Sequence, residues 1–177
     1  PIVERLVGEQ QPDGGWNCER ANGSVRSSFD TTINVLEGLA GFERATGGTP
    51  ASRRARRVGE EYLLCRGLFR RRSTGEPAQE RYLHLLHPGR WRYDVLRGLD
   101  HFRAAAALAT TPPDPRLADA IGVVRERRQP DGRWLLEDEL RGRIWFAVDD
   151  GPGQPSRWLT LRALRVIRWL EGWAGLS

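Results

Sequence analysis

The sequence predicts an all-α fold made of about three repeated α-hairpins, and two internal repeats indicate it. The longer phrase occurs twice, 118 residues apart, as Gln11-Pro12-Asp13-Gly14-Gly15-Trp16 with Glu19 and as Gln129-Pro130-Asp131-Gly132-Arg133-Trp134 with Glu137. The shorter phrase has starts 60 and 65 residues apart, at Leu36-Glu37-Gly38-Leu39, Leu96-Arg97-Gly98-Leu99 and Leu161-Arg162-Ala163-Leu164. Repeats of this length are typical of helical pairs that bury their apolar faces only by stacking on neighbouring pairs.

The first elements follow from apolar spacing and turn residues. Residues 1–10 match the end of a helix, which the first Pro-Asp-Gly turn stops. After a polar loop over 17–27, Ser28 is a suitable N-cap for a helix over about 28–45. A Gly-Gly-Thr-Pro turn ends that helix. The next helix is expected over about 51–66, and a loop is expected over 67–78.

The remaining elements continue the alternation of helix and turn. Residues 79–87 are expected to form one short helix, and further helices are expected over about 91–109, 116–128 and 156–173. The apolar stretch 144–148 could pair as a strand within the loop that precedes the last helix. The second helix of each pair is the more apolar, so we expect it to lie inside and the first helix outside.

Length and composition favour one domain. The 177 residues suffice for a buried core, so we expect a single domain over 1–177 with units at about 1–47, 48–110 and 111–177. The two cysteines do not form a disulfide framework, and no apolar run is long enough for a transmembrane segment, so we expect a cytoplasmic protein. The 28 basic residues are all arginine and 23 acids lie among them, so nucleic-acid binding is not expected despite the net charge of +5.

The residues of the repeated longer phrase suit a structural clasp. Asp-Gly is a turn pair, because glycine adopts positive φ at low cost and aspartate bonds nearby amides. Proline prevents the preceding helix from continuing, and glutamine can bond the backbone groups left open at a helix end. Tryptophan offers a flat face that can stack on the next hairpin. We therefore expect this phrase to hold hairpins together rather than to perform chemistry.

The phrase also resembles a known family. Gln followed by Gly-x-Trp at the junction of paired helices resembles the QW repeat of squalene–hopene cyclases and oxidosqualene cyclases, which share an α/α toroid with protein prenyltransferase β subunits. Residues 13–39 and 156–164 are similar to the Gly-Gly-aromatic loop and the inner helix of that superfamily. The resemblance implies a partial α/α toroid, with a cavity for an isoprenoid or other hydrophobic small molecule at the N-terminal ends of the inner helices.

The family toroid has six hairpins and this chain about three. Because the chain also has no methionine and opens inside a helical pattern, we expect it to be the C-terminal part of a longer protein. An open half-toroid would expose apolar inner faces, so a homodimer or pairing with the missing N-terminal half is expected. Peripheral membrane contact is a further possibility.

The chemistry of the resembling enzymes is not evident in this chain. Protonating cyclases need an Asp-x-Asp-Asp acid, and the nearest run here is Asp149-Asp150 in a Gly-Pro loop. Prenyltransferases need zinc held by Asp, Cys and His, but Asp30-Thr31-Thr32 at the matching helix start has neither Cys nor His beside it. Whether the protein is an enzyme therefore stays open, and the alternative is a non-catalytic helical-repeat module that binds a peptide or protein on its concave face.

Candidate site residues lie at the expected starts of the inner helices. Cys18 and Glu19 near Asp30, or the pair His84 and His87, could ligate a metal, but neither set is complete, so we expect no metal and no cofactor. Arginines at the mouth could hold an anion, and aromatic faces could pack on a polyprenyl chain, unless both only brace the hairpin ends. The candidates are, for acid–base roles, Asp30, Tyr93 and Asp94 and, for substrate binding, Arg90, Trp91, Arg92, Arg157 and Trp158.

Overall fold

The computed structural model describes residues 2–140, 142 and 145–174, and the fold is mostly helical with one small sheet. Short 3₁₀ turns η1, η2 and η3 cover Cys18–Asn22, Glu80–Tyr82 and Pro115–Leu117. The α-helices of the described part are α1 Ile2–Gly8, α2 Phe29–Thr46, α3 Pro50–Leu64, α4 Val95–Ala109, α5 Ala118–Glu126 and α6 Arg157–Ala174. Two α-helices thus fall in each of the ranges 1–47, 48–110 and 111–177.

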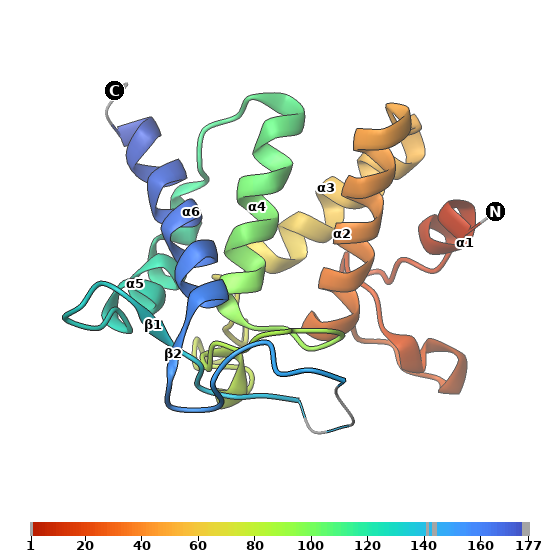
Figure 1. Ribbon diagram of the computed structural model, residues 1–177. Helices are drawn as coiled ribbons and strands as arrows, with labels where there is room; N and C mark the ends of the chain where they lie inside the picture. The colour runs from red at the N-terminus through yellow and green to blue at the C-terminus, as the bar shows by residue number, and fades with distance from the viewer. Residues whose placement is uncertain (1, 141, 143–144, 175–177) are drawn as a thin grey trace.

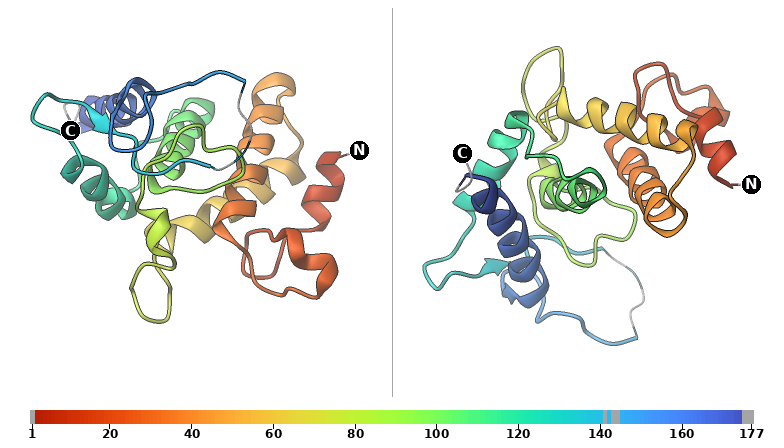
Figure 2. Two further views of the ribbon diagram at one scale, coloured as in Figure 1. Left: turned by 60° about the horizontal axis from the view of Figure 1, so that its bottom comes forward. Right: turned by 90° about the horizontal axis from the view of Figure 1, so that it is seen from above.

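Helices α2, α4 and α6 stand side by side and run in the same direction, with their N-terminal ends at the bottom of Figure 1. Helix α4 is in the middle and packs against both α2 and α6. Helices α3 and α5 lie behind this row, where α3 packs on α2 and α5 on α4, and α1 packs on α3 (Figure 2, right). The second helix of each pair therefore lies in one row and the first helix in another, and an inside and an outside of a toroid stay a prediction.

The starts of the three front helices are capped by side chains. Ser28 accepts a hydrogen bond from the backbone N–H of Thr31, as predicted for the start of α2. In the same way, the side chain of Asp94 accepts from the backbone N–H of Arg97 at the start of α4, and that of Ser156 accepts from the backbone N–H of Leu159 at the start of α6. Each cap satisfies one of the backbone donors that a helix leaves open at its first turn.

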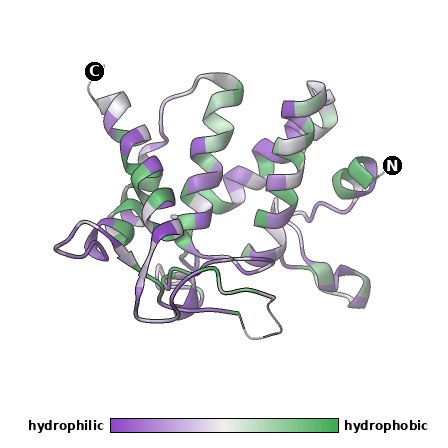
Figure 3. Cartoon of the chain, in the orientation of Figure 1, coloured by the Kyte–Doolittle hydropathy of each residue, from purple (hydrophilic) through white to green (hydrophobic). Residues whose placement is uncertain are grey.

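The hydrophobic core extends through all of these helices. Figure 3 shows polar and apolar residues interleaved along α2, α4 and α6, as expected for helices with one buried side. The core includes large side chains from every unit, among them Trp16, Leu36, Leu63, Leu96, Leu99, Leu117, Trp134 and Leu159.

The tryptophans of the two copies of the repeated longer phrase make equivalent hydrogen bonds. The indole N–H of Trp16 donates to the carbonyl of Leu6 at 2.7 Å, and that of Trp134 to the carbonyl of Val124 at 2.7 Å. The backbone N–H groups of the two tryptophans donate to Oγ1 of Thr32 and of Thr160, at 3.0 and 3.1 Å. Each tryptophan thus joins the end of one helix to the first turn of the second helix in its unit.

Two predicted elements are wrong. Residues 79–87 form only the turn η2, because the next residues pair with the chain after β1: Leu86 bridges Asp138, and Glu137 donates its backbone N–H to the carbonyl of Leu85. His84 and His87 therefore do not share a helix face. Of the stretch 144–148, which was expected to pair as a strand, residue 144 lies outside the described residues, and 145–148 are bends and irregular chain. The strands are instead β1 Trp134–Leu135 and β2 Pro155–Ser156, which are antiparallel.

Candidate functional site

Asp30 lies in the first turn of α2 and joins it to the segment before α4. Its Oδ1 accepts a hydrogen bond from the backbone N–H of Tyr93 at 2.8 Å, and its carboxylate forms an ion pair with Arg81. The hydroxyl of Tyr82 donates to Oδ2 at 3.5 Å. The carboxylate of Asp30 is therefore engaged by three groups and is mostly enclosed.

Tyr93 and Asp94 are both fully buried. The Tyr93 hydroxyl donates to the carbonyl of Leu68 at 2.6 Å, and its ring packs against Phe29 and Tyr82. The Asp94 carboxylate accepts the N–H of Arg97 at 2.7 Å as the helix cap. Burial raises the pKa of Asp94, although the charge of Arg162 and backbone hydrogen bonds oppose that rise. Both side chains have structural partners, and a role toward a ligand stays a prediction.

The segment Arg90, Trp91 and Arg92 is braced from α4. Arg97 donates to the carbonyls of Arg90 and Arg92, at 2.9 and 2.8 Å. Arg92 forms an ion pair with Asp138 at 2.6 Å. The side chain of Trp91 is 58% exposed, and its carbonyl accepts from the Asn34 amide. The bracing alternative is therefore present for this segment, through the ion pair of Arg92 with Asp138.

Arg157 and Trp158 lie exposed at the start of α6. The ring of Trp158 stacks on His87 with centroids 5.5 Å apart, and its N–H donates to the Val148 carbonyl at 3.3 Å. Burial and the charge of Arg162 lower the pKa of His87. The structure thus brings Asp30 to Tyr93, while Trp158 meets His87 instead of the other predicted residues. A cavity of about 100 Å³ at this end is lined by His87, Arg90 and Asp149, among others.

The metal candidates are dispersed. Cys18 is exposed, and its backbone N–H donates to Thr31. His84 is also exposed, and His87 is half-buried against Trp158. Over residues 2–140, 142 and 145–174 no three side chains of His, Cys, Asp or Glu gather as they would around a metal ion. None of the helices in that same part is long and apolar enough to cross a bilayer.

A larger cavity, of about 620 Å³, lies between α3 and α4 near the C-terminal end of α2, and not at the N-terminal ends of α2, α4 and α6, where the resemblance implied it. The loop 111–115 and Trp169 of α6 close two of its sides. Its apolar wall consists of Leu64, Phe102, Ala105, Ala106, Leu108, Leu117 and Trp169. Its charged wall consists of Glu43, Arg53, Arg56, Arg57, Glu60 and Asp114.

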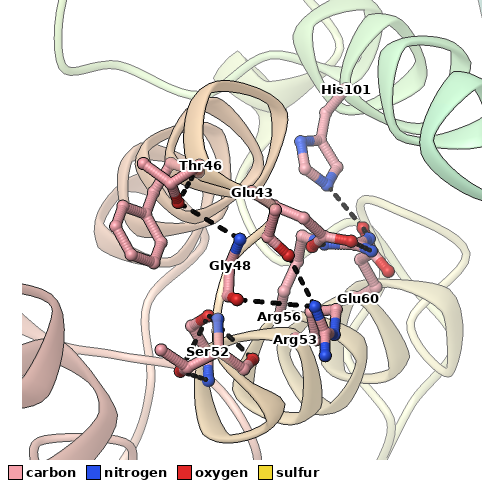
Figure 4. A network of polar contacts seen from close by, with 11 residues as sticks. Glu43, Thr46, Gly48, Ser52, Arg53, Arg56, Glu60 and His101 are labelled. Carbon is pink, nitrogen blue, oxygen red and sulfur yellow. Dashed lines mark hydrogen bonds and ion pairs between the residues drawn. The ribbon is translucent and has the colours of Figure 1, made fainter.

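A buried charge network forms part of that wall (Figure 4). Arg56 of α3 donates to Glu43 of α2 at 2.8 Å and to Glu60, one helical turn further along α3, at 2.6 Å. His101 of α4 is 4% exposed, and its Nε2 lies 2.9 Å from Oε1 of Glu60. The network therefore links α2, α3 and α4 with two carboxylates, one guanidinium and one imidazole.

The electrostatics of the network favour an ionised Glu60. Burial alone would raise the pKa of its carboxyl, but the hydrogen bond from His101 and the charges of His101 and Arg56 outweigh burial and lower it. Arg56 is likewise stabilised in its charged form by the two glutamates. The carboxylate of Glu60 is thus held as an anion at the edge of an apolar cavity.

Sequence reasoning missed this site. Glu43, Arg56, Glu60 and His101 come from three helices, and no motif joins them. The spacing of Arg56 and Glu60 was a usable indication, because charges of opposite sign four residues apart share a helix face. No motif or spacing in the sequence links His101 of α4 to Glu60, so this contact can be recognised only in the folded structure.

A scan of protein-family models and searches of curated proteins and of solved structures returned no match to this chain. The function proposed below depends on the geometry of the cavity and on the sequence resemblance. Fold alone does not define function, so the cavity carries the greater weight.

Proposed function

We propose that this chain binds an apolar small molecule, of isoprenoid kind, in the cavity between α3 and α4, as part of a protein similar to the terpenoid cyclase and prenyltransferase superfamily. The observation that carries the proposal is the cavity itself. Its volume of about 620 Å³ lies within the range of roughly 300–1,000 Å³ that is typical of small-molecule sites. Such sites combine apolar walls with a few convergent polar groups.

The walls suit an apolar ligand. Phe102 and Trp169 supply aromatic faces, and Leu64 and Leu117 supply aliphatic ones. Ala105 and Ala106 keep the α4 side of the cavity open, because a methyl group occupies little of the space that a larger side chain would fill. A branched hydrocarbon is the ligand class that gains most from such a surface, since burial contributes about 25 cal/mol per Å² of apolar area.

The helix arrangement supports the superfamily part of the proposal. Three parallel helices in one row, each preceded by a helix of a second row, match the inner and outer layers that the resemblance implies. The carboxylates at the starts of the inner helices are engaged in an ion pair and a helix cap. The proposal therefore concerns binding, and it assigns no reaction to Asp30 or Asp94.

Blocking the cavity tests the proposal. Ala106→Trp should fill it, while Ala107→Trp places the same ring on the next position of α4, which lines the neighbouring hollow toward α6 and not this cavity. The probe is farnesyl methyl ether, and binding is followed by isothermal titration calorimetry. We expect saturable binding to the wild type and to Ala107→Trp and none to Ala106→Trp. Equal binding by all three proteins would contradict the proposal, and so would a wild type that binds neither farnesyl methyl ether nor farnesol.

One observation favours the second candidate, a module that binds a peptide or protein. Ion pairs run across the front row, from Glu37 of α2 to Arg97 of α4 and from Asp100 of α4 to Arg162 of α6. Charged side chains on that row suit a polar partner better than a hydrocarbon. Charge reversal at Glu37 should then weaken capture of such a partner and leave farnesyl methyl ether binding unchanged.

A further inference from the structure

We propose that Glu60 is the group that selects the ligand, and that the cavity takes an uncharged apolar alcohol whose hydroxyl donates a hydrogen bond to Oε2 of Glu60. This inference rests on the proposed function, because it needs a ligand in the cavity between α3 and α4. Glu60 lines that cavity and is only 9% exposed. Its carboxylate is therefore a nearly buried acceptor at the wall.

The two oxygens of Glu60 are used unequally. Oε1 accepts from Arg56 at 2.6 Å and lies 2.9 Å from Nε2 of His101. Within the described residues, Oε2 accepts no hydrogen bond, and it is not one of the fully enclosed polar atoms that lack a partner. Glu43 differs, because both of its oxygens accept from Arg56.

A hydrogen-bond acceptor in this position favours a ligand that donates a hydrogen bond to it. Because the Glu60 side chain is largely buried, few water molecules can reach Oε2, and a ligand that donates a hydrogen bond to it replaces that limited hydration. Arg56 and His101 hold Oε1 from two helices, so the carboxylate cannot turn its free oxygen away without losing them. The direction of the acceptor is thus fixed before the ligand arrives, which lowers the cost of binding.

The charges around the cavity favour an uncharged donor over a cation. Arg53 and Arg57 lie four residues apart on the wall, and like charges at this spacing repel. Arg53 donates to the carbonyls of Gly47 and Gly48 and has no carboxylate partner within the described residues. An ammonium ligand would meet these two guanidinium groups, and an acidic ligand would meet the anion of Glu60 itself. An uncharged hydroxyl group is repelled neither by the guanidinium groups nor by the carboxylate of Glu60.

The test compares farnesol, farnesyl methyl ether and farnesylamine by isothermal titration calorimetry. The ether keeps the chain and the oxygen of farnesol but has no donor. We expect farnesol to bind the wild type about 10- to 100-fold more tightly than the ether, the range for a hydrogen bond to a charged group. Equal affinities for farnesol and the ether, or tighter binding of farnesylamine, would overturn the assignment while leaving the proposed function intact.

Substitutions at Glu60 and Glu61 test whether the preference for farnesol over the ether depends on Glu60. Glu60→Gln keeps the shape but presents an amide N–H₂ where Oε2 was, so it should bind farnesol and the ether equally. Glu61→Gln is the matched control, because Glu61 pairs with Arg116 outside the cavity, and it should keep the wild-type preference. A preference that survives in Glu60→Gln would refute the role of Glu60. The comparison of ligands on the wild type decides the question by itself if Glu60→Gln does not fold, and failure of all three ligands to bind would refute the proposed function as well.

Discussion

The indole N–H of Trp134 donates to the carbonyl of Val124 at 2.7 Å, inside a fully buried contact that fixes the end of α5 to the start of α6. Trp134→Phe removes that donor and part of the ring. We expect a loss of about 2–4 kcal/mol in the free energy of unfolding, since a buried carbonyl loses its partner and a cavity remains. Urea denaturation measures it.

The other copy of the phrase supplies the control for that substitution. Trp16→Phe removes the equivalent bond to Leu6, whose surroundings are only partly buried, so water can replace the lost donor. We expect a smaller loss than for Trp134→Phe. A larger loss at Trp16 would show that the two clasps do not share one energetic basis.

Glycines at the same position of the shorter repeated phrase should respond in opposite directions. A Cβ on Gly38 of α2 meets no atom within 4 Å, so Gly38→Ala should stabilise the protein by about 0.5–1 kcal/mol through helix propensity. A Cβ on Gly98 of α4 would collide with the hydroxyl of Tyr93, so Gly98→Ala should destabilise by about 1–3 kcal/mol. Thermal unfolding of both variants checks this, and shifts of the same sign would refute it.

The raised pKa of Asp94 predicts a pH dependence of stability. A carboxyl whose pKa is higher in the folded state contributes stability that is complete below its ordinary pKa of about 3.9 and is lost as pH rises through the folded-state pKa. Asp94→Asn keeps a good helix cap and removes this titration. The stability of the wild type relative to Asp94→Asn should therefore fall as the pH rises above about 4. A difference that is constant over that range would count against the burial effect.

Arg56 should be costly to remove. Its side chain is 6% exposed and neutralises Glu43 and Glu60, so Arg56→Met leaves two nearly buried carboxylates without their cation. Breaking a buried ion pair in this way costs about 3–5 kcal/mol. Arg54→Met, on the exposed side of the same helix, should change stability by no more than about 0.5 kcal/mol. Similar losses for both variants would show that the network does not hold the helices together.

Elements with a local cause could be predicted from the sequence. The start of α2 at Ser28 depends on a cap and on apolar spacing within one segment, and both are visible in the chain. The helix expected over 79–87 was wrong for the opposite reason. Its apolar residues Leu85 and Leu86 suit a helix equally well, and only their pairing with Glu137 and Asp138, far along the chain, selects the extended form.

The candidate site shows the same limit. Asp94 was noted as an acid, yet whether a carboxylate at a helix start faces a ligand or its own backbone depends on the packing around it. The cavity between α3 and α4 is built from five separate segments, namely parts of α2, α3 and α4, the loop 111–115 and Trp169 of α6. Its central pair joins Glu60 and His101, and that contact exists only once the helices are placed.

That pair also determines where the molecule can open. Helix α4 is held to α2 and α6 by apolar packing and by the ion pairs of Arg97 with Glu37 and of Asp100 with Arg162. Across the cavity, the imidazole of His101 on α4 meets the carboxylate of Glu60 on α3. Small fluctuations that break this contact would admit water between the two layers of helices. The hydrogen bonds of Trp16 and Trp134 would stay intact. Amide protons of the α3 turn from Arg56 to Glu60 should then exchange with solvent sooner than those of the first turns of α4, so that ligand entry and local opening of the fold would occur at the same contact.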